Sequence, residues 1–191
     1  MNMNMKKKNM LFFGEIPGAV AHGVSVSNRI NINLLKEYFK VFCIQESSLF
    51  GSSRTKYLYL RMLEIIILPY QVYQLRKFKF KFLYFTLSLS IFGLLKNLLL
   101  LWSAHIFLSC DRSVVHIHRG DLEDFFYSSS FGRFLLVSLF KKLDSVIVLS
   151  DSQVKFVSEQ FNVRVFVVRN TIEYSNNENP VVKGDNESIR F

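Results

Sequence analysis

Two histidines and a group of charged residues follow a short apolar segment near the middle of the chain. The stretch reads SVVHIHRGDLEDFF, from Ser113 to Phe126. Three kinds of chemistry use such residues: a metal site, acid–base catalysis, and the polar edge of a binding crevice. The elements that position the histidines decide among them.

A metal site is the least favoured of the three. His116 and His118 can supply two zinc ligands, but a third is needed, and neither His22 nor His105 belongs to a ligand motif. The two cysteines lack C-x-x-C spacing, which disfavours a cysteine zinc site and a disulfide framework and fits a reducing compartment. We therefore expect no bound metal.

Acid–base catalysis has candidates in His118 and in the carboxylates of Asp121, Glu123 and Asp124. A solvated acidic loop that caps a helix is the more common explanation for such carboxylates. For His118 we favour a hydrogen-bonding role at the edge of a crevice. His116 is also consistent with a core histidine whose hydrogen bonds are satisfied.

Short apolar runs alternate with segments of helical periodicity along the chain. Strands are expected at 9–13, 40–44, 79–86, 114–117, 145–149 and 164–168, and helices from residue 25, at 57–73 with a break or bend near Pro69, and at 91–107, 132–143 and 151–161. This order predicts an α/β fold, a Rossmann-like and mostly parallel sheet with helices on both faces. We expect residues 1–172 to form one domain, and the polar residues 173–191 to form a linker or tail.

Ligands of open parallel sheets bind beyond the carboxyl ends of the strands. His116, His118 and Arg119 follow one such end, and other strands deliver further small or polar residues to the same edge: Gly14, Gly18, His22, Gly23, Ser150 and Asn170. Glycines let a ligand approach the backbone, but their spacing here is not G-x-G-x-x-G. A ligand-binding loop and a tight strand-to-helix turn both remain open for this segment.

The segment from Phe82 to Cys110 is long enough to span a bilayer. Lys96 and Asn97 near its centre would be costly in lipid, and two serines and a glycine divide it at 88–93. We therefore expect a strand and a helix of a folded domain, and keep a single-span membrane protein as an alternative. The N-terminus lacks the apolar stretch of a signal peptide.

The chain carries a net charge of +9, which favours anionic partners. Between Arg54 and Lys81 there are seven Lys and Arg residues and one glutamate, interleaved with aromatic residues. Such a patch suits peripheral contact with an anionic membrane, and equally an ordinary solvated helix face. No nucleic-acid-binding motif is recognisable, so nucleic acid is not an expected partner.

Five segments in this order resemble the N-terminal half of family 4 glycosyltransferases of the GT-B fold, of the type that builds bacterial capsule and exopolysaccharide. They read GEIPGAVAHGVSVSNRININLL, FLYFTLSLSIFGLLKN, VVHIHRGDLEDFF, KKLDSVIVLSDSQVKFV and VFVVRNTIE, within residues 10–173. One departure is Arg169, which stands where the family commonly has proline.

The resemblance implies transfer of a hexose from a nucleotide sugar, with retention of configuration and no bound cofactor, to a lipid-linked or saccharide acceptor. His118 would contact the transferred sugar as the catalytic residue. The expected substrate-binding residues are Gly18, His22, Gly23, His116, Arg119, Ser150 and Asn170. The location implied is cytoplasmic, at the inner face of the plasma membrane.

The family places most of its nucleotide contacts in a second domain, and the sequence has no later glycine loop, basic pair or glutamate pair that would represent it. We therefore expect the chain to need a partner chain carrying that domain, or to be a truncated product. A non-catalytic Rossmann-like interaction subunit is the alternative from another functional class.

Overall fold

The computed structural model describes residues 7–17, 23–46 and 54–169. Over these residues the chain forms one sheet of six parallel strands in the order β2-β1-β3-β4-β5-β6. The strands are β1 (Lys8–Glu15), β2 (Phe39–Glu46), β3 (Phe82–Thr86), β4 (Arg112–His116), β5 (Ser145–Val148) and β6 (Arg164–Val167). The expected Rossmann-like α/β fold is confirmed.

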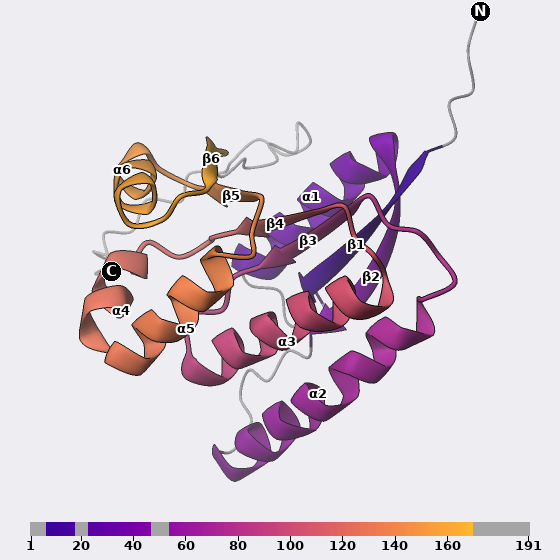
Figure 1. Cartoon of the computed structure of the whole chain (residues 1–191), viewed down its shortest axis with the longest axis horizontal. Coiled ribbons are helices and arrows are strands. Elements are labelled where there is room, and N and C mark those ends of the chain that lie inside the picture. The colour runs from indigo at the N-terminus through magenta and orange to yellow at the C-terminus, as the bar shows by residue number, and fades with distance from the viewer. Residues whose placement is uncertain (1–6, 18–22, 47–53, 170–191) are drawn as a thin grey trace, which may run out of the picture.

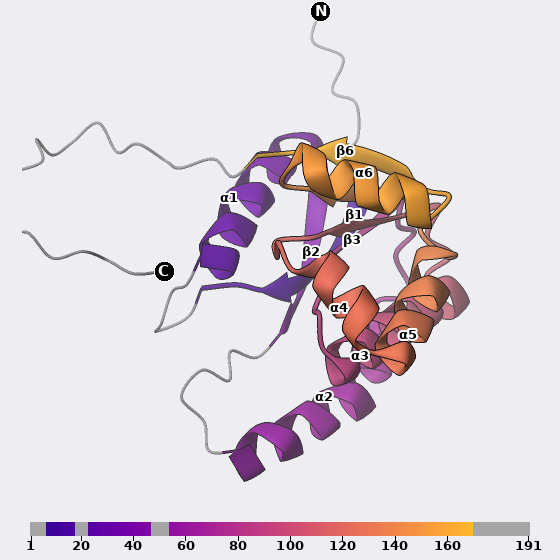
Figure 2. The same ribbon diagram turned by 90° about the vertical axis from the view of Figure 1, so that its left-hand side faces the viewer.

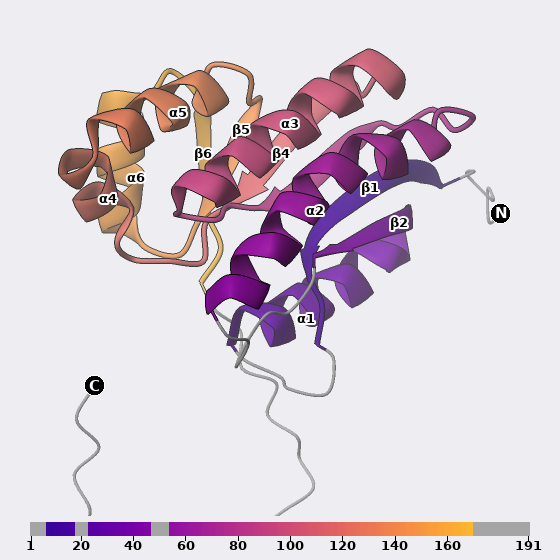
Figure 3. The same ribbon diagram turned by 90° about the horizontal axis from the view of Figure 1, so that it is seen from below.

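The helices lie on both faces of the sheet, but unevenly (Figures 1 and 2). They are α1 (Gly23–Tyr38), α2 (Arg54–Gln74), α3 (Ile91–Phe107), α4 (Leu122–Ser128), α5 (Ser130–Phe140) and α6 (Asp151–Gln160). Viewed from below, α2, α3 and α5 lie across one face, and α1 lies on the other (Figure 3). The larger apolar core is therefore on the side of α2, α3 and α5.

Alternation along the strands explains the two cores. Leu11 and Phe13 of β1 pack into the larger core, whereas Met10 and Phe12 pack with Ile32 of α1 in a smaller one. Both faces of this strand are buried, which is why it is a continuous apolar run.

The strand order reverses between β1 and β3. The chain leaves β1 through α1 to reach β2 at one edge, and then returns through α2 to β3 on the other side of β1. In open parallel sheets such a reversal opens a crevice at the carboxyl ends of the two central strands. The topology therefore places a candidate site beside the ends of β1 and β3.

Three local expectations were wrong. The acidic segment expected as a loop forms the short helix α4, in which Leu122 and Phe126 are buried. Helix α2 continues through Pro69, so the break expected there is absent. Strand β3 begins at Phe82 rather than at residue 79, and most other ends differ by one to three residues.

The segment from Phe82 to Cys110 divides as expected into a strand and a helix. Ser90 caps α3, and its side-chain oxygen accepts a hydrogen bond from the Gly93 N–H at 3.1 Å. Asn97 is fully buried, and its amide donates to the Thr86 carbonyl and accepts from the Ser88 N–H, both at 3.3 Å. None of the helices described is long and apolar enough to cross a bilayer.

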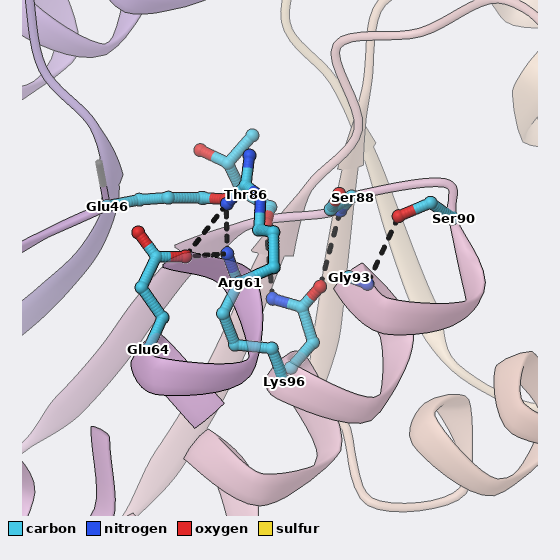
Figure 4. Close-up of polar contacts among 9 residues, drawn as sticks. Glu46, Arg61, Glu64, Thr86, Ser88, Ser90, Gly93 and Lys96 are labelled. Atoms are coloured by element: carbon cyan, nitrogen blue, oxygen red, sulfur yellow. Dashed lines mark hydrogen bonds and ion pairs between the residues drawn. The ribbon is translucent and has the colours of Figure 1, made fainter. Parts of the chain in front are cut away.

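The Lys96 side chain is 3% exposed and lies within a cluster of four charged groups (Figure 4). Its ammonium pairs with Glu46 at the end of β2, and with Glu64 of α2 at 3.4 Å. Arg61 of α2 contacts the same two carboxylates, at 2.5 Å and 2.9 Å. Two cations and two carboxylates thereby join β2, α2 and α3 in a partly buried ion-pair network.

Replacing Lys96 tests whether this network holds α2 in place. Lys96→Met leaves two carboxylates to share Arg61, so we expect the free energy of unfolding to fall by about 2 to 3 kcal/mol in urea denaturation. Lys155→Met, an exposed lysine on α6, is the matched control and should change stability little. A loss of the same size in the control would contradict the structural role of the network.

Gly93 allows the turn before α3 to pack closely. A methyl group there would lie 2.2 Å from Ser88 Oγ and 2.5 Å from Ser88 Cβ. We expect Gly93→Ala to lower the free energy of unfolding by about 2 kcal/mol, because the turn must shift to make room. Gly120→Ala, which has no atom within 4 Å of the added carbon, is the control. Equal stability of the two variants would argue against the tight turn.

Candidate functional site

A buried asparagine of α1 joins the carboxyl ends of β1 and β3 where the strand order reverses. Asn28 of α1 is fully buried, donates to the Glu15 carbonyl at 2.8 Å, and accepts from the Thr86 hydroxyl at 3.1 Å. A side chain at Gly14 would lie 2.9 Å from Thr86 Oγ1, so glycine allows this close contact. These contacts fix α1 against the ends of β1 and β3.

The two histidines lie side by side, one strand further along the same edge. Their ring centroids are 3.9 Å apart with planes inclined by 34°, as expected for residues two apart on a strand. His116 is buried at the end of β4, and His118 is half-buried just beyond it. The histidine pair predicted from the sequence is therefore brought together.

Tyr84 and Asn31 orient His116. The Tyr84 hydroxyl lies 2.5 Å from His116 Nδ1, and the Asn31 amide nitrogen lies 3.4 Å from that hydroxyl. Burial raises the pKa of Tyr84, so the phenol stays protonated and donates to Nδ1. The remaining proton of a neutral His116 is then on Nε2. Asn31 thus donates a hydrogen bond to Tyr84, and Tyr84 donates one to the imidazole of His116.

Neither Nε2 atom has a hydrogen-bond partner among the described residues, although both are buried. An unpaired buried polar group is unfavourable, so such atoms often mark a place where a ligand or water binds. His116 is therefore not the fully satisfied core histidine that the sequence left open. Its Nδ1 is satisfied, and its Nε2 is not.

Both imidazoles are neutral in the folded protein. Burial lowers the pKa of His116 to about 3, with a further contribution from the neighbouring His118, and burial lowers the pKa of His118 to about 4. A neutral imidazole can donate or accept a hydrogen bond but supplies no positive charge. The pair is suited to binding hydroxyl groups rather than to neutralising an anion.

A small cavity of about 10 Å³ lies between α1 and the ends of β4 and β6, with room for about one water molecule. Its lining includes Asn31, His116, His118 and Arg169. Arg169 is exposed, and its guanidinium lies 3.2 Å from the Asp151 carboxylate. Sequence reasoning noted Arg169 only as a departure from a family pattern. Its position directly before Asn170, at the end of a predicted strand, was the available signal.

The other residues predicted for the site form no hydrogen bond with the histidine pair in the described structure, or lie outside the described residues. Ser150 caps α6, and its hydroxyl accepts from the Gln153 N–H at 3.4 Å. Arg119 is exposed and forms a two-point ion pair with Asp121. Gly23 begins α1 and has open space around it. Gly18, His22 and Asn170 lie outside the described residues.

Gln153, in the first turn of α6, connects the segments that follow two strands. Its amide donates to the Arg119 carbonyl at 2.6 Å and accepts from the Leu149 N–H at 3.0 Å. The loop after β4 is thereby tied to the loop after β5. This contact keeps the segment that follows His118 in place.

Over the part of the chain that the structure describes, no three His, Cys, Asp or Glu side chains are grouped so that they could hold a metal ion. The described site combines the neutral side chains of Asn31, His116 and His118 with two exposed arginines, Arg119 and Arg169, at its margin.

Comparison with known proteins gives no assignment for this chain. No protein-family model matches the sequence, and no curated protein matches it.

The depressed histidine pKa values predict a loss of stability in acid. Imidazoles in the unfolded chain take up protons as pH falls through about 6.5, whereas these two stay neutral until about pH 4 or 3. The unfolded state then binds more protons, so stability falls with pH in that window. We expect a loss of about 2 kcal/mol for each histidine, about 4 kcal/mol together, between about pH 7 and about pH 5.

Urea denaturation at the two pH values measures this loss. His118→Gln removes one of the two groups and should reduce the dependence on pH. His105→Gln, at an exposed histidine of α3, is the control with the same change of residue type. A pH dependence that is unchanged in His118→Gln would contradict the neutral state of this imidazole.

Proposed function

We propose that this chain is the acceptor-side half of a glycosyltransferase, which transfers a hexose from a nucleotide sugar to a lipid-linked or saccharide acceptor. The observation that carries the proposal is the pair of neutral histidines whose buried Nε2 atoms have no partner among the described residues. A sugar hydroxyl can donate and accept hydrogen bonds. A neutral imidazole, which has one donor and one acceptor nitrogen, can therefore pair with it. The location proposed is the inner face of the plasma membrane.

The position of the pair in the fold supports the proposal. The histidines follow a central strand, at the edge where parallel sheets bind their ligands. Tyr84 and Asn31 hold His116, and the His116 ring lies against that of His118, so the binding groups are arranged before a sugar arrives. In this proposal His118 contacts the transferred hexose, and His116 positions it.

The uneven cover of the sheet supports a requirement for a second domain or partner chain. On the face where α1 lies, Ile147 of β5 is only half-buried, and its neighbour Phe166 of β6 is 54% exposed. A further domain would bury this apolar surface. The same domain would supply cations for the nucleotide diphosphate, since the described edge offers only the exposed Arg119 and Arg169 beside the histidines.

Replacing His118 tests the proposal on the whole chain. Saturation-transfer NMR with a panel of nucleotide hexoses should show saturation of the hexose protons in the wild type. His118→Ala should reduce that saturation at least several-fold, because a buried donor to the sugar is lost. His105→Ala, on an exposed helix position, should leave it unchanged. Equal saturation in both variants would contradict the assignment of His118.

The bare sheet face also favours a second candidate, a non-catalytic interaction subunit. In that case no nucleotide hexose gives saturation with the wild type. Phe166→Ser would then weaken capture of a partner chain, whereas His118→Ala would not. The two functions therefore differ in which of the two substitutions has an effect.

A further inference from the structure

The outer face of α2 carries an apolar stripe that no described element covers. Tyr59, Leu63, Ile66, Tyr70 and Tyr73 follow one another at helical spacing, and all are exposed, Ile66 by 70%. A solvent-facing helix of a globular protein is normally polar on that side. An apolar stripe of about four turns therefore indicates a surface that meets an apolar partner.

Helix α3 continues this surface. Leu95, Trp102 and Ile106 form a second exposed stripe, with Trp102 exposed by 58%. The two helices meet where the rings of Tyr73 and Phe107 lie 5.3 Å apart. Figure 3 shows α2 and α3 side by side on the same face of the sheet. The two apolar stripes thus adjoin on one face of the protein.

Lysines and arginines gather where this face reaches the amino-terminal edge of the sheet. An open groove of about 840 Å³ there is lined by Lys7, Lys8, Arg76, Lys79 and Lys81. Lys81 pairs with Asp111 at 2.7 Å. Lys7 directly precedes β1 and Lys8 begins it, and both join a cluster that the sequence placed only between residues 54 and 81.

Arg61 was expected in the basic patch but does not belong to it. Arg61 is turned into the ion-pair network with Glu46 and Glu64, away from solvent. The side chains of Arg54 and Lys56 lie outside the described residues. The cationic region is therefore the amino-terminal edge of the sheet, and the outer face of α2 is aromatic and aliphatic.

A second groove, of about 580 Å³, lies at the same edge and combines both kinds of side chain. Trp102, Leu101 and Ile106 form its apolar wall, and Arg112 and Lys142 are on its polar wall. Asp111 and Asp144 also line it, but Asp144 accepts hydrogen bonds from Ser113. Apolar and cationic walls in one groove suit the junction between a phosphate headgroup and an acyl chain.

We propose that the outer faces of α2 and α3, with the basic amino-terminal edge of the sheet, dock the protein on a bilayer containing anionic phospholipid. The aromatic stripes enter the headgroup region, and the lysines contact lipid phosphates. Charge decides against a second copy of the chain, because a symmetric contact would bring the same cations together. This inference does not depend on the proposed sugar transfer.

This docking leaves the histidine site free. His116 ends β4 at the carboxyl edge, whereas Arg112 begins the same strand at the edge that contacts lipid. The crevice is therefore directed away from the headgroups that the lysines contact. A nucleotide sugar could reach it from the aqueous phase while the protein is on the membrane.

Trp102 is the single tryptophan of the chain, so its fluorescence reports directly on the proposed face. The full-length protein is mixed with vesicles of phosphatidylcholine alone, or of phosphatidylcholine with phosphatidylglycerol. We expect a blue shift, quenching by brominated acyl chains and co-sedimentation with the anionic vesicles only. Added salt should weaken binding.

Two variants and two matched controls test the surface. Ile66→Ser removes an apolar contact, and Lys8→Glu with Lys79→Glu reverses two charges that line the basic groove. Each change should weaken vesicle binding about thirtyfold or more. Leu34→Ser on α1 and Lys155→Glu on α6 make the same kinds of change on exposed residues elsewhere and should bind as the wild type does.

Several results would overturn the proposal. Emission from Trp102 that does not change with either kind of vesicle would exclude insertion of this face. Emission that is already blue-shifted without lipid, in a species of dimer mass, would assign the face to a second copy. Equal losses in the test and control variants would show that no particular surface is used.

Discussion

The buried ammonium group of Lys96 is the constraint on which much of this structure depends. It lies where β2, α2 and α3 meet, and it forms ion pairs there with Glu46 and Glu64. Without those carboxylates, burial of a lysine would cost several kcal/mol. The network keeps α2 beside α3, and so sets which side of α2 faces solvent.

The position of α2 has consequences at both edges of the sheet. Because α2 pairs with α3 through one side, its aromatic stripe faces outward and extends to the lysines at the amino-terminal edge. At the carboxyl edge, α1 supplies Asn28 and Asn31 to the ends of the central strands. A doubly wound topology thus separates a candidate binding edge from a candidate docking edge.

The sequence went far in predicting the fold, and less far in predicting the site. Apolar runs predicted all six described strands, because β1 to β5 each bury side chains in the core and β6 packs Val165 against it. The pairing of His116 with His118 followed from spacing alone. Tyr84, Asn31 and Gln153 were not identified as their partners, because they come from other elements and no local pattern marks a buried hydrogen bond between distant segments. Helix α4 was missed because three carboxylates obscured its short apolar side.

By itself, the sequence determined the α/β class, the division of Phe82–Cys110 into strand and helix, and the delivery of two histidines to a strand end. These features depend on local periodicity and on turn residues. Only the tertiary structure decided the neutral state of the histidines and the roles of the basic residues. Burial lowers the imidazole pKa values, and packing turns Arg61 inward while Lys7 and Lys8 join Lys79 and Lys81. Both effects arise from which distant segments pack together, and spacing along the chain does not contain that information.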